Sequence, residues 1–136
     1  MEGQAPTNPA RDAEAEEPPA KSDCLAVGRV LDRIGDKWTV MVVGVLSKGP
    51  LRFNAMMRAI DGVSHRMLTR TLRSLERDGL VNRAVYPTVP PKVEYELTEV
   101  GHSLIKPLRA LLGWAREHRP VIESSRRDYD RSDDRA

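Results

Sequence analysis

Residues 61–81 read Asp-Gly-Val-Ser-His-Arg-Met-Leu-Thr-Arg-Thr-Leu-Arg-Ser-Leu-Glu-Arg-Asp-Gly-Leu-Val. This stretch predicts a helix from Ser64 to Asp78, because a serine side chain can cap a helix N-terminus and Gly79 favours the left-handed conformation that ends one. Val63 and Leu68 occupy the two positions of a hydrophobic staple, which sets the direction of the chain at the start of the helix. The side of the helix expected to be buried consists of Leu68, Leu72 and Leu75.

The opposite side of this helix is rich in arginine. Its residues are His65, Arg66, Thr69, Arg70, Arg73 and Arg77. The arginines recur at intervals of 4, 3 and 4 residues, so they share one helical face. A guanidinium group can bind a guanine base with two hydrogen bonds or hold a phosphate, and a threonine hydroxyl can reach either. The alternative interpretation is a charged face that only contacts solvent.

The chain before this helix predicts the first half of a helix-turn-helix. Asn54 can cap a short helix, and Asp61-Gly62 supplies the turn between the two helices. Residues 51–53, which follow the break at Gly49-Pro50, are short enough for an edge strand.

Two further elements are expected nearer the N-terminus. Asp23 can cap a helix over residues 24–34, and Asp36 can cap a second element over residues 37–47. The β-branched residues of the second element favour a strand, whereas its length and its cap favour a buried helix. The residues alone leave both possibilities open.

After the arginine-rich helix, apolar and polar residues alternate in two runs, a pattern typical of a half-buried β-hairpin. Its inward positions are Val81, Val85, Val93, Tyr95 and Leu97. The proline-stiffened connection of residues 86–91 is too long for a tight turn. Thr98 can then cap a final helix that reaches about His118. Pro107 must kink this helix or mark a restart near Lys106.

This order of elements predicts a mainly α-helical fold with a small β-hairpin, the winged helix-turn-helix domain. In such a domain the second helix of the pair normally lies in the DNA major groove, with its first residues facing the base edges. The helix from Ser64 to Asp78 is therefore the predicted reading helix.

Charge is divided unevenly along the 136 residues. The formal net charge is +2, but residues 1–23 carry −4, residues 24–119 carry +7 and residues 120–136 carry −1. A basic domain between acidic ends indicates a polyanionic partner. We expect a disordered, acidic Pro/Ala-rich tail over residues 1–22, one domain over residues 23–119 and a second charged, disordered tail over residues 120–136.

Several classes of protein are excluded by the composition. A single cysteine excludes a disulfide framework and multi-cysteine zinc sites, and it suits a cytoplasmic location. No run of 18 apolar residues could span a membrane, and the acidic N-terminus does not resemble a signal peptide. Because no phosphate-binding loop, nucleophile elbow or pair of catalytic acids is recognisable, we expect no enzymatic activity, no cofactor and no metal site.

Several stretches in fixed order resemble the HxlR-type bacterial transcriptional regulators. They are Cys24, residues 31–39, 52–54, 64–81 and 89–98, within a resemblance that covers about residues 24–118. The resemblance implies a dimeric winged-helix protein that binds double-stranded DNA at a pseudo-palindromic operator. It also implies that the ambiguous element over residues 37–47 is a helix.

Candidate DNA contacts lie on the reading helix and on both sides of it. The candidates for contact with base edges or nearby phosphates are Ser64, His65, Arg66, Thr69 and Arg70. The candidates for contact with the backbone or the adjacent minor groove are Arg52, Asn54, Pro90 and Lys92. Arg52 and Asn54 lie at the start of a helix, where free N–H groups attract phosphate. Arg73 is a further candidate, although it could instead pair with Glu76.

Cys24 is a candidate redox or effector sensor. In redox-sensing members of the resembled family, a cysteine at the corresponding position responds to oxidants or electrophiles. That cysteine is usually followed by proline, whereas Leu25 follows here. With no second cysteine in the chain, the response would be a disulfide between subunits or an adduct. The alternative is a small buried hydrophobic residue.

These observations lead to one principal hypothesis and one alternative. The principal hypothesis is a homodimer in which the last helix and the Cys24 helix form the interface and hold two reading helices about one DNA turn apart, roughly 34 Å. It leaves open which small-molecule effector, if any, the protein binds. The alternative is a winged-helix interaction module whose arginine stripe binds an acidic protein.

Overall fold

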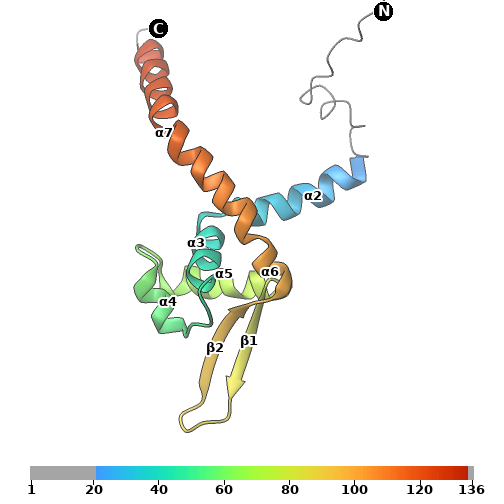
Figure 1. Ribbon diagram of the computed structural model, residues 1–136. Helices are drawn as coiled ribbons and strands as arrows, with labels where there is room; N and C mark the ends of the chain where they lie inside the picture. Colours follow the sequence, from blue (N-terminus) through green and yellow to red (C-terminus); the bar gives the residue numbers. More distant parts are fainter. Residues whose placement is uncertain (1–20, 135–136) are drawn as a thin grey trace, which may run out of the picture. The chain divides into compact units, whose positions relative to one another are not determined.

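The computed structural model describes residues 21–134 (Figure 1). Residues 1–20 of the expected acidic tail lie outside the described residues. The chain divides into two units, one ending at Ile34 and one beginning at Gly35. Among residues 21–134, no helix is both long enough and apolar enough to cross a membrane.

The described part of the first unit is a single amphipathic helix, α2 (Lys21–Ile34). None of its residues is buried. Its exposed apolar side chains are Leu25, Val27, Val30 and Leu31. The expected cap at Asp23 is wrong, because the helix already includes Lys21 and Asp23 lies in its first turn.

The second unit contains the helix-turn-helix and the hairpin. Its elements are α3 (Lys37–Leu46), α4 (Phe53–Ala59), α5 (His65–Arg77), β1 (Val81–Tyr86), β2 (Lys92–Leu97), α6 (Glu99–Ser103) and α7 (Ile105–Asp134). In Figure 1, α3 lies against α5, and the hairpin extends away from the helices. The mainly α-helical winged helix-turn-helix predicted from the sequence is confirmed.

Helix α3 resolves the ambiguity between a strand and a helix. The Asp36 carboxylate accepts a hydrogen bond of 2.8 Å from the Trp38 N–H and so caps the helix, as predicted. Its buried residues Val42, Val43 and Leu46 belong to the core. The helix therefore provides apolar surface against which α5 can pack.

The helix-turn-helix pair is formed by α4 and α5. The connecting turn uses Gly62 at a φ of 81°, which glycine adopts without the steric penalty of a side chain. Ser64 caps α5 as predicted, because its Oγ accepts a hydrogen bond of 3.1 Å from the Met67 N–H. Asn54 does not cap α4, because the helix already begins at Phe53. Arg52 is the N-cap residue, and its side chain forms no capping hydrogen bond.

Strands β1 and β2 form an antiparallel pair in which Val81 faces Leu97, Arg83 faces Tyr95 and Val85 faces Val93. Of the expected edge strand over residues 51–53, Leu51 forms an isolated bridge with Tyr95. Val81 and Leu97 are buried, whereas 57% of Val85 is exposed. The prediction that the inward side chains are buried is therefore confirmed next to the helices. It is wrong toward the tip, because there the hairpin extends beyond the core.

The C-terminal region restarts as the proline predicted, at Ile105 after the short helix α6. Pro107 lies in the first turn of α7. Backbone N–H groups in the first turn have no acceptor within the helix, so the N–H that proline lacks costs the helix little stability. Thr98 caps α6, because its Oγ1 accepts a hydrogen bond from the Gly101 N–H. The same hydroxyl donates to the Gly79 carbonyl at 2.6 Å and so ties α6 to the end of α5.

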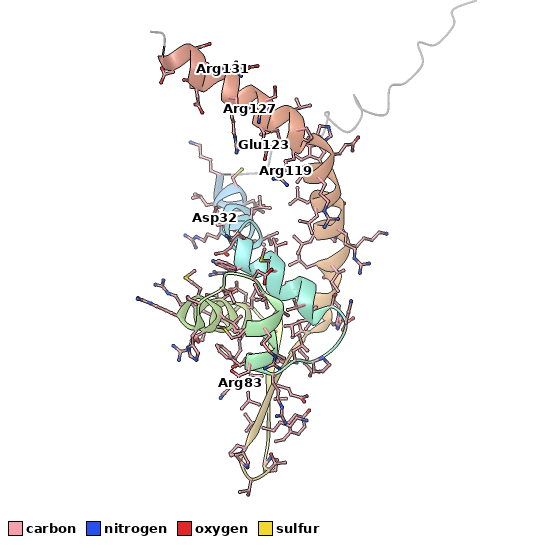
Figure 2. All side chains as sticks on the ribbon, turned by 90° about the vertical axis from the view of Figure 1, so that its left-hand side faces the viewer. Asp32, Arg83, Arg119, Glu123, Arg127 and Arg131 are labelled. Carbon is pink, nitrogen blue, oxygen red and sulfur yellow. The ribbon has the colours of Figure 1, made fainter. Side chains whose placement is uncertain are left out.

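The expected end of the last helix near His118 is wrong, because α7 runs to Asp134 through most of the expected tail. Ion pairs along the helix favour this continuation: Arg119 donates to Glu123 at 2.8 Å one turn away. That hydrogen bond is the main cause that lowers the pKa of Glu123. Pro120 lies inside the helix, and Figure 2 shows a change of direction beside Arg119 and Glu123, as expected where a proline removes a helical hydrogen bond.

Replacement of Gly101 by alanine is expected to destabilise the second unit. The added Cβ would collide with the carbonyl oxygen of Leu80 and lie 3.2 Å from Cδ2 of Leu97. Overpacking of this kind costs about 1–3 kcal/mol in the free energy of unfolding. Urea titration monitored by circular dichroism, at one protein concentration for all variants, measures it.

Gly44→Ala is the matched control, because a Cβ at this exposed position of α3 would have no atom within 4 Å outside the neighbouring backbone of its own helix. It is expected to leave stability unchanged or to raise it by up to about 1 kcal/mol. A Gly101→Ala variant as stable as the original protein would contradict the close packing of α6 against Leu80.

Candidate nucleic-acid interface

Helix α5 has two chemically opposite faces. Leu68, Leu72 and Leu75 are buried in the core, with exposed fractions of 0%, 2% and 0%. The residues on the opposite face are Arg66, Arg70, Arg73 and Arg77, and all four are exposed. We call these four residues the arginine face. Because the leucines fix the rotation of α5, the arginine face must point to solvent.

In the first two turns of α5, some polar side chains already form hydrogen bonds within the protein and others do not. Ser64 accepts the capping hydrogen bond, and the Thr69 hydroxyl donates to the His65 carbonyl at 2.8 Å. The His65 ring lies 4.7 Å from that of Phe53. Arg66 and Arg70 form no ion pair or hydrogen bond with another described residue. No group in the described part of the chain therefore uses the hydrogen-bond donors of these two guanidinium groups.

Arg73 and Glu76 do not form the ion pair considered as an alternative, at least among residues 21–134. Both line a cavity of about 370 Å³ between α5, the start of α4 and the hairpin. Arg83 of β1 lines the same cavity, and Figure 2 shows it on the half of the hairpin next to the helices. Sequence reasoning missed Arg83. Strand alternation places it on the same face as Val81, but only its pairing with Tyr95 shows that it lines this cavity.

Arg52 and Asn54 are exposed at the start of α4. They line a second, more open depression of about 580 Å³ together with Arg58 and with Pro91 of the loop between the strands. The structure therefore brings the beginning of α4 and the base of the hairpin loop to one surface. Arg58 was not among the residues expected to contact DNA, because it ends a helix whose exposed side has no arginine periodicity.

The hairpin, called the wing from here on, contains two predicted DNA contacts, Pro90 and Lys92, and their surroundings differ. Pro90 is exposed in the loop, where its carbonyl accepts a hydrogen bond of 2.8 Å from the Thr88 hydroxyl. The Lys92 ammonium is 2.9 Å from Glu94 and 5.5 Å from the centre of the Tyr86 ring. Any contact of Lys92 with phosphate must therefore compete with Glu94.

Cys24 belongs to α2 in the first unit and is exposed. Its alternative role as a small buried residue is wrong for the single chain. Among the described residues, no group of three or more histidine, cysteine or acidic side chains is arranged to hold a metal ion.

Comparison with known proteins identifies the family. A family model described as HxlR-like helix-turn-helix matches residues 33–123. The chain belongs to this family. The match includes all of the second unit's elements up to the middle of α7, and the resemblance seen in the sequence is confirmed.

Relatives of this HxlR-type protein are regulators of transcription. An uncharacterized HTH-type transcriptional regulator from Methanothermobacter thermautotrophicus is 50% identical over 95 residues, which cover 70% of this chain and 72% of that protein. The HTH-type regulator YybR of Bacillus subtilis is 44% identical over 108 residues, or 79% of this chain and 86% of that protein. The HxlR-type chain is thus an HTH-type transcriptional regulator and not an enzyme.

Solved structures resemble it as well. The redox regulator HypR in its reduced form superposes with a TM-score of 0.67 at 43% identity, covering 73% of this chain and 98% of that chain. The reduced form of the transcriptional regulator YodB from B. subtilis gives a TM-score of 0.62 at 34% identity, over 68% of this chain and 90% of that chain.

Glu94→Gln is expected to strengthen the binding of duplex DNA. The substitution releases Lys92 from its ion pair and removes a negative charge from the wing, so affinity should rise about 2–5-fold at low salt and less at higher salt. Fluorescence anisotropy with a labelled duplex measures the change. Glu117→Gln, an equal change of charge on α7, should have a smaller effect. Equal effects of the two substitutions would show that only net charge matters.

Proposed function

We propose that this HxlR-type regulator binds a pseudo-palindromic operator as a homodimer, with one α5 helix in each of two successive major grooves. The observation that carries the proposal is the exposed arginine face opposite three buried leucines. A helix held in this way can present guanidinium groups to base edges and phosphates without rotating. Membership of the HxlR-like family supports the same assignment.

The proposed contacts divide into two groups. The residues that face base edges or the phosphates beside them are Ser64, His65, Arg66, Thr69 and Arg70. The residues that hold the DNA backbone or the adjacent minor groove are Arg52, Asn54, Arg73, Pro90 and Lys92. Within residues 21–134, Arg66 and Arg70 form no ion pair that would have to break before they bind DNA, and this supports their leading role. Backbone contacts position the protein, and base contacts supply the sequence preference.

Two exposed apolar surfaces support the homodimer. On α7, 53% of Leu111 and 54% of Trp114 are exposed, and Leu112 is exposed beside them. On α2, Leu25, Val27, Val30 and Leu31 of the amphipathic face are exposed. Contiguous apolar side chains of this size on a small domain are typical of protein–protein interfaces. In the proposed homodimer the two reading helices would lie roughly 34 Å apart, the length of one DNA turn.

Replacing Arg66 or Arg70 by alanine is expected to weaken operator binding. A bidentate contact with a base contributes about 1–3 kcal/mol, so affinity should fall about 5–150-fold for the operator and much less for a scrambled duplex. Anisotropy titration against both duplexes measures the ratio, with an operator obtained by selecting fragments from the source genome. Arg109→Ala, at an exposed position of α7, is the charge-matched control.

Unchanged operator affinity in both variants would contradict the assignment of α5 as the reading helix. If the arginine face instead binds an acidic protein, that binding would also weaken with salt. The chain would then bind operator and scrambled duplex with equal affinity. The ratio of the two DNA affinities therefore distinguishes the proposal from the alternative interaction module.

We further propose that Cys24 makes this regulator responsive to oxidants or electrophiles. The exposure of Cys24 supports the proposal, and the solved relatives HypR and YodB include oxidised and diamide-treated forms. Diamide treatment is expected to change operator affinity at least threefold in the original protein and not in Cys24→Ser. Non-reducing electrophoresis separates a disulfide between subunits from an adduct. Equal affinities before and after treatment would exclude sensing by Cys24.

A further inference from the structure

The cavity between α5 and the wing shares His65, Thr69 and Arg73 with the proposed DNA contacts, but its other lining residues have no proposed contact with DNA. Its volume is about 370 Å³, within the usual range for small-molecule sites. Residues from α4, α5 and both strands line it, and all of these elements belong to the second unit. The walls combine charged groups, aromatic rings and aliphatic side chains, so the cavity offers both polar and apolar surface to a ligand.

The charged groups of this cavity carry a net positive charge. Arg73 and Arg83 contribute two guanidinium groups, and Glu76 contributes one carboxylate. None of the three forms an ion pair with another described residue. A monoanion would therefore neutralise the cavity, and a planar carboxylate matches the paired donors of a guanidinium group. Glu76 would oppose a dianion such as phosphate more strongly than a monoanion.

The remaining walls favour an aromatic ring. Phe53 and His65 lie with ring centres 4.7 Å apart at an angle of 53°, and Tyr95 lines the cavity from β2. Leu72 and Val93 add aliphatic surface. A phosphate group would leave these rings without a partner, whereas an aryl group can pack against their faces and edges.

We propose that this cavity binds a small aromatic monocarboxylate, with the carboxylate on Arg73 and Arg83 and the ring against Phe53, His65 and Tyr95. The cavity borders the arginine face, and Arg73 belongs to both. A bound carboxylate therefore withdraws positive charge from the surface that contacts DNA. Ligand and DNA oppose each other's binding by the same factor. This competition rests on the proposed function, but ligand binding does not.

Benzoate is the probe for the site. Titration of the full chain without DNA, followed by calorimetry and by amide chemical shifts, is expected to show saturable binding of one benzoate per chain. Cyclohexanecarboxylate keeps the charge without the aromatic ring, and benzyl alcohol keeps the ring without the charge. Each should bind at least about fivefold more weakly, since each loses one of the two interactions.

Arg83→Gln and Arg73→Gln are each expected to weaken benzoate binding at least about tenfold, and Arg83→Lys by less, because lysine keeps the charge but not the paired donors. Arg109→Gln, an exposed arginine outside the cavity, should bind within twofold of the original protein. In the presence of operator DNA, benzoate should raise the dissociation constant of the original protein and not that of Arg83→Gln.

Three results would overturn the proposal. The first is the absence of saturable benzoate binding up to about 10 mM. The second is an equal loss of benzoate affinity in Arg109→Gln and Arg83→Gln. The third is that inorganic phosphate binds as tightly as benzoate and loses the same affinity in Arg83→Gln. The last result would identify a phosphate site for the DNA backbone instead. Because the titrations contain no DNA, a failure of the proposed operator binding leaves them unaffected and is recognised separately.

Discussion

The packing of the α5 leucines into the core is the constraint on which the rest of the structure depends. Leu68, Leu72 and Leu75 are almost completely buried and fix the rotation of the helix about its axis. The Ser64 cap fixes where the helix begins, and Gly79, at a φ of 75°, allows the chain to turn toward β1 where it ends. With rotation and both ends fixed, the arginine face has one possible direction, which is outward.

The same arrangement explains the position of the wing and the cavity beneath it. The Thr98 hydroxyl bridges the end of α5 and the start of α6, so the hairpin between them is anchored to the reading helix at its base. Beyond Val81 and Leu97 the strands leave the core, and the space between them and α5 becomes the cavity that Arg73 and Arg83 share. One surface of α5 can therefore face DNA while its flank faces a small ligand, and Arg73 connects the two.

The sequence was sufficient for the elements whose signals are local. The caps of α3, α5 and α6 and the restart of the last helix after α6 all follow from side-chain chemistry within a few residues. The length of α7 could not be predicted in this way. A polar segment containing Pro120 resembles a tail, and exposed charge pairs such as Arg119 with Glu123 contribute only weakly to its helical form.

The parts of the site that the sequence missed depend on tertiary arrangement. Arg83 became a candidate only when the strand register placed it opposite Tyr95, beside the flank of α5. The competition between Glu94 and phosphate for Lys92 depends on side-chain positions that alternation does not specify. Asn54 was misjudged because a capping residue and the second residue of a helix differ only in backbone conformation.

In the proposed complex, two α5 helices related by symmetry read one operator. Hydroxyl-radical footprinting of a selected operator tests this arrangement most directly, because it locates each contact along both strands. A symmetric homodimer should give two protected regions, related by two-fold symmetry, with centres about 10 base pairs apart. A single protected region, or protection that is the same on operator and scrambled duplex, would contradict this arrangement.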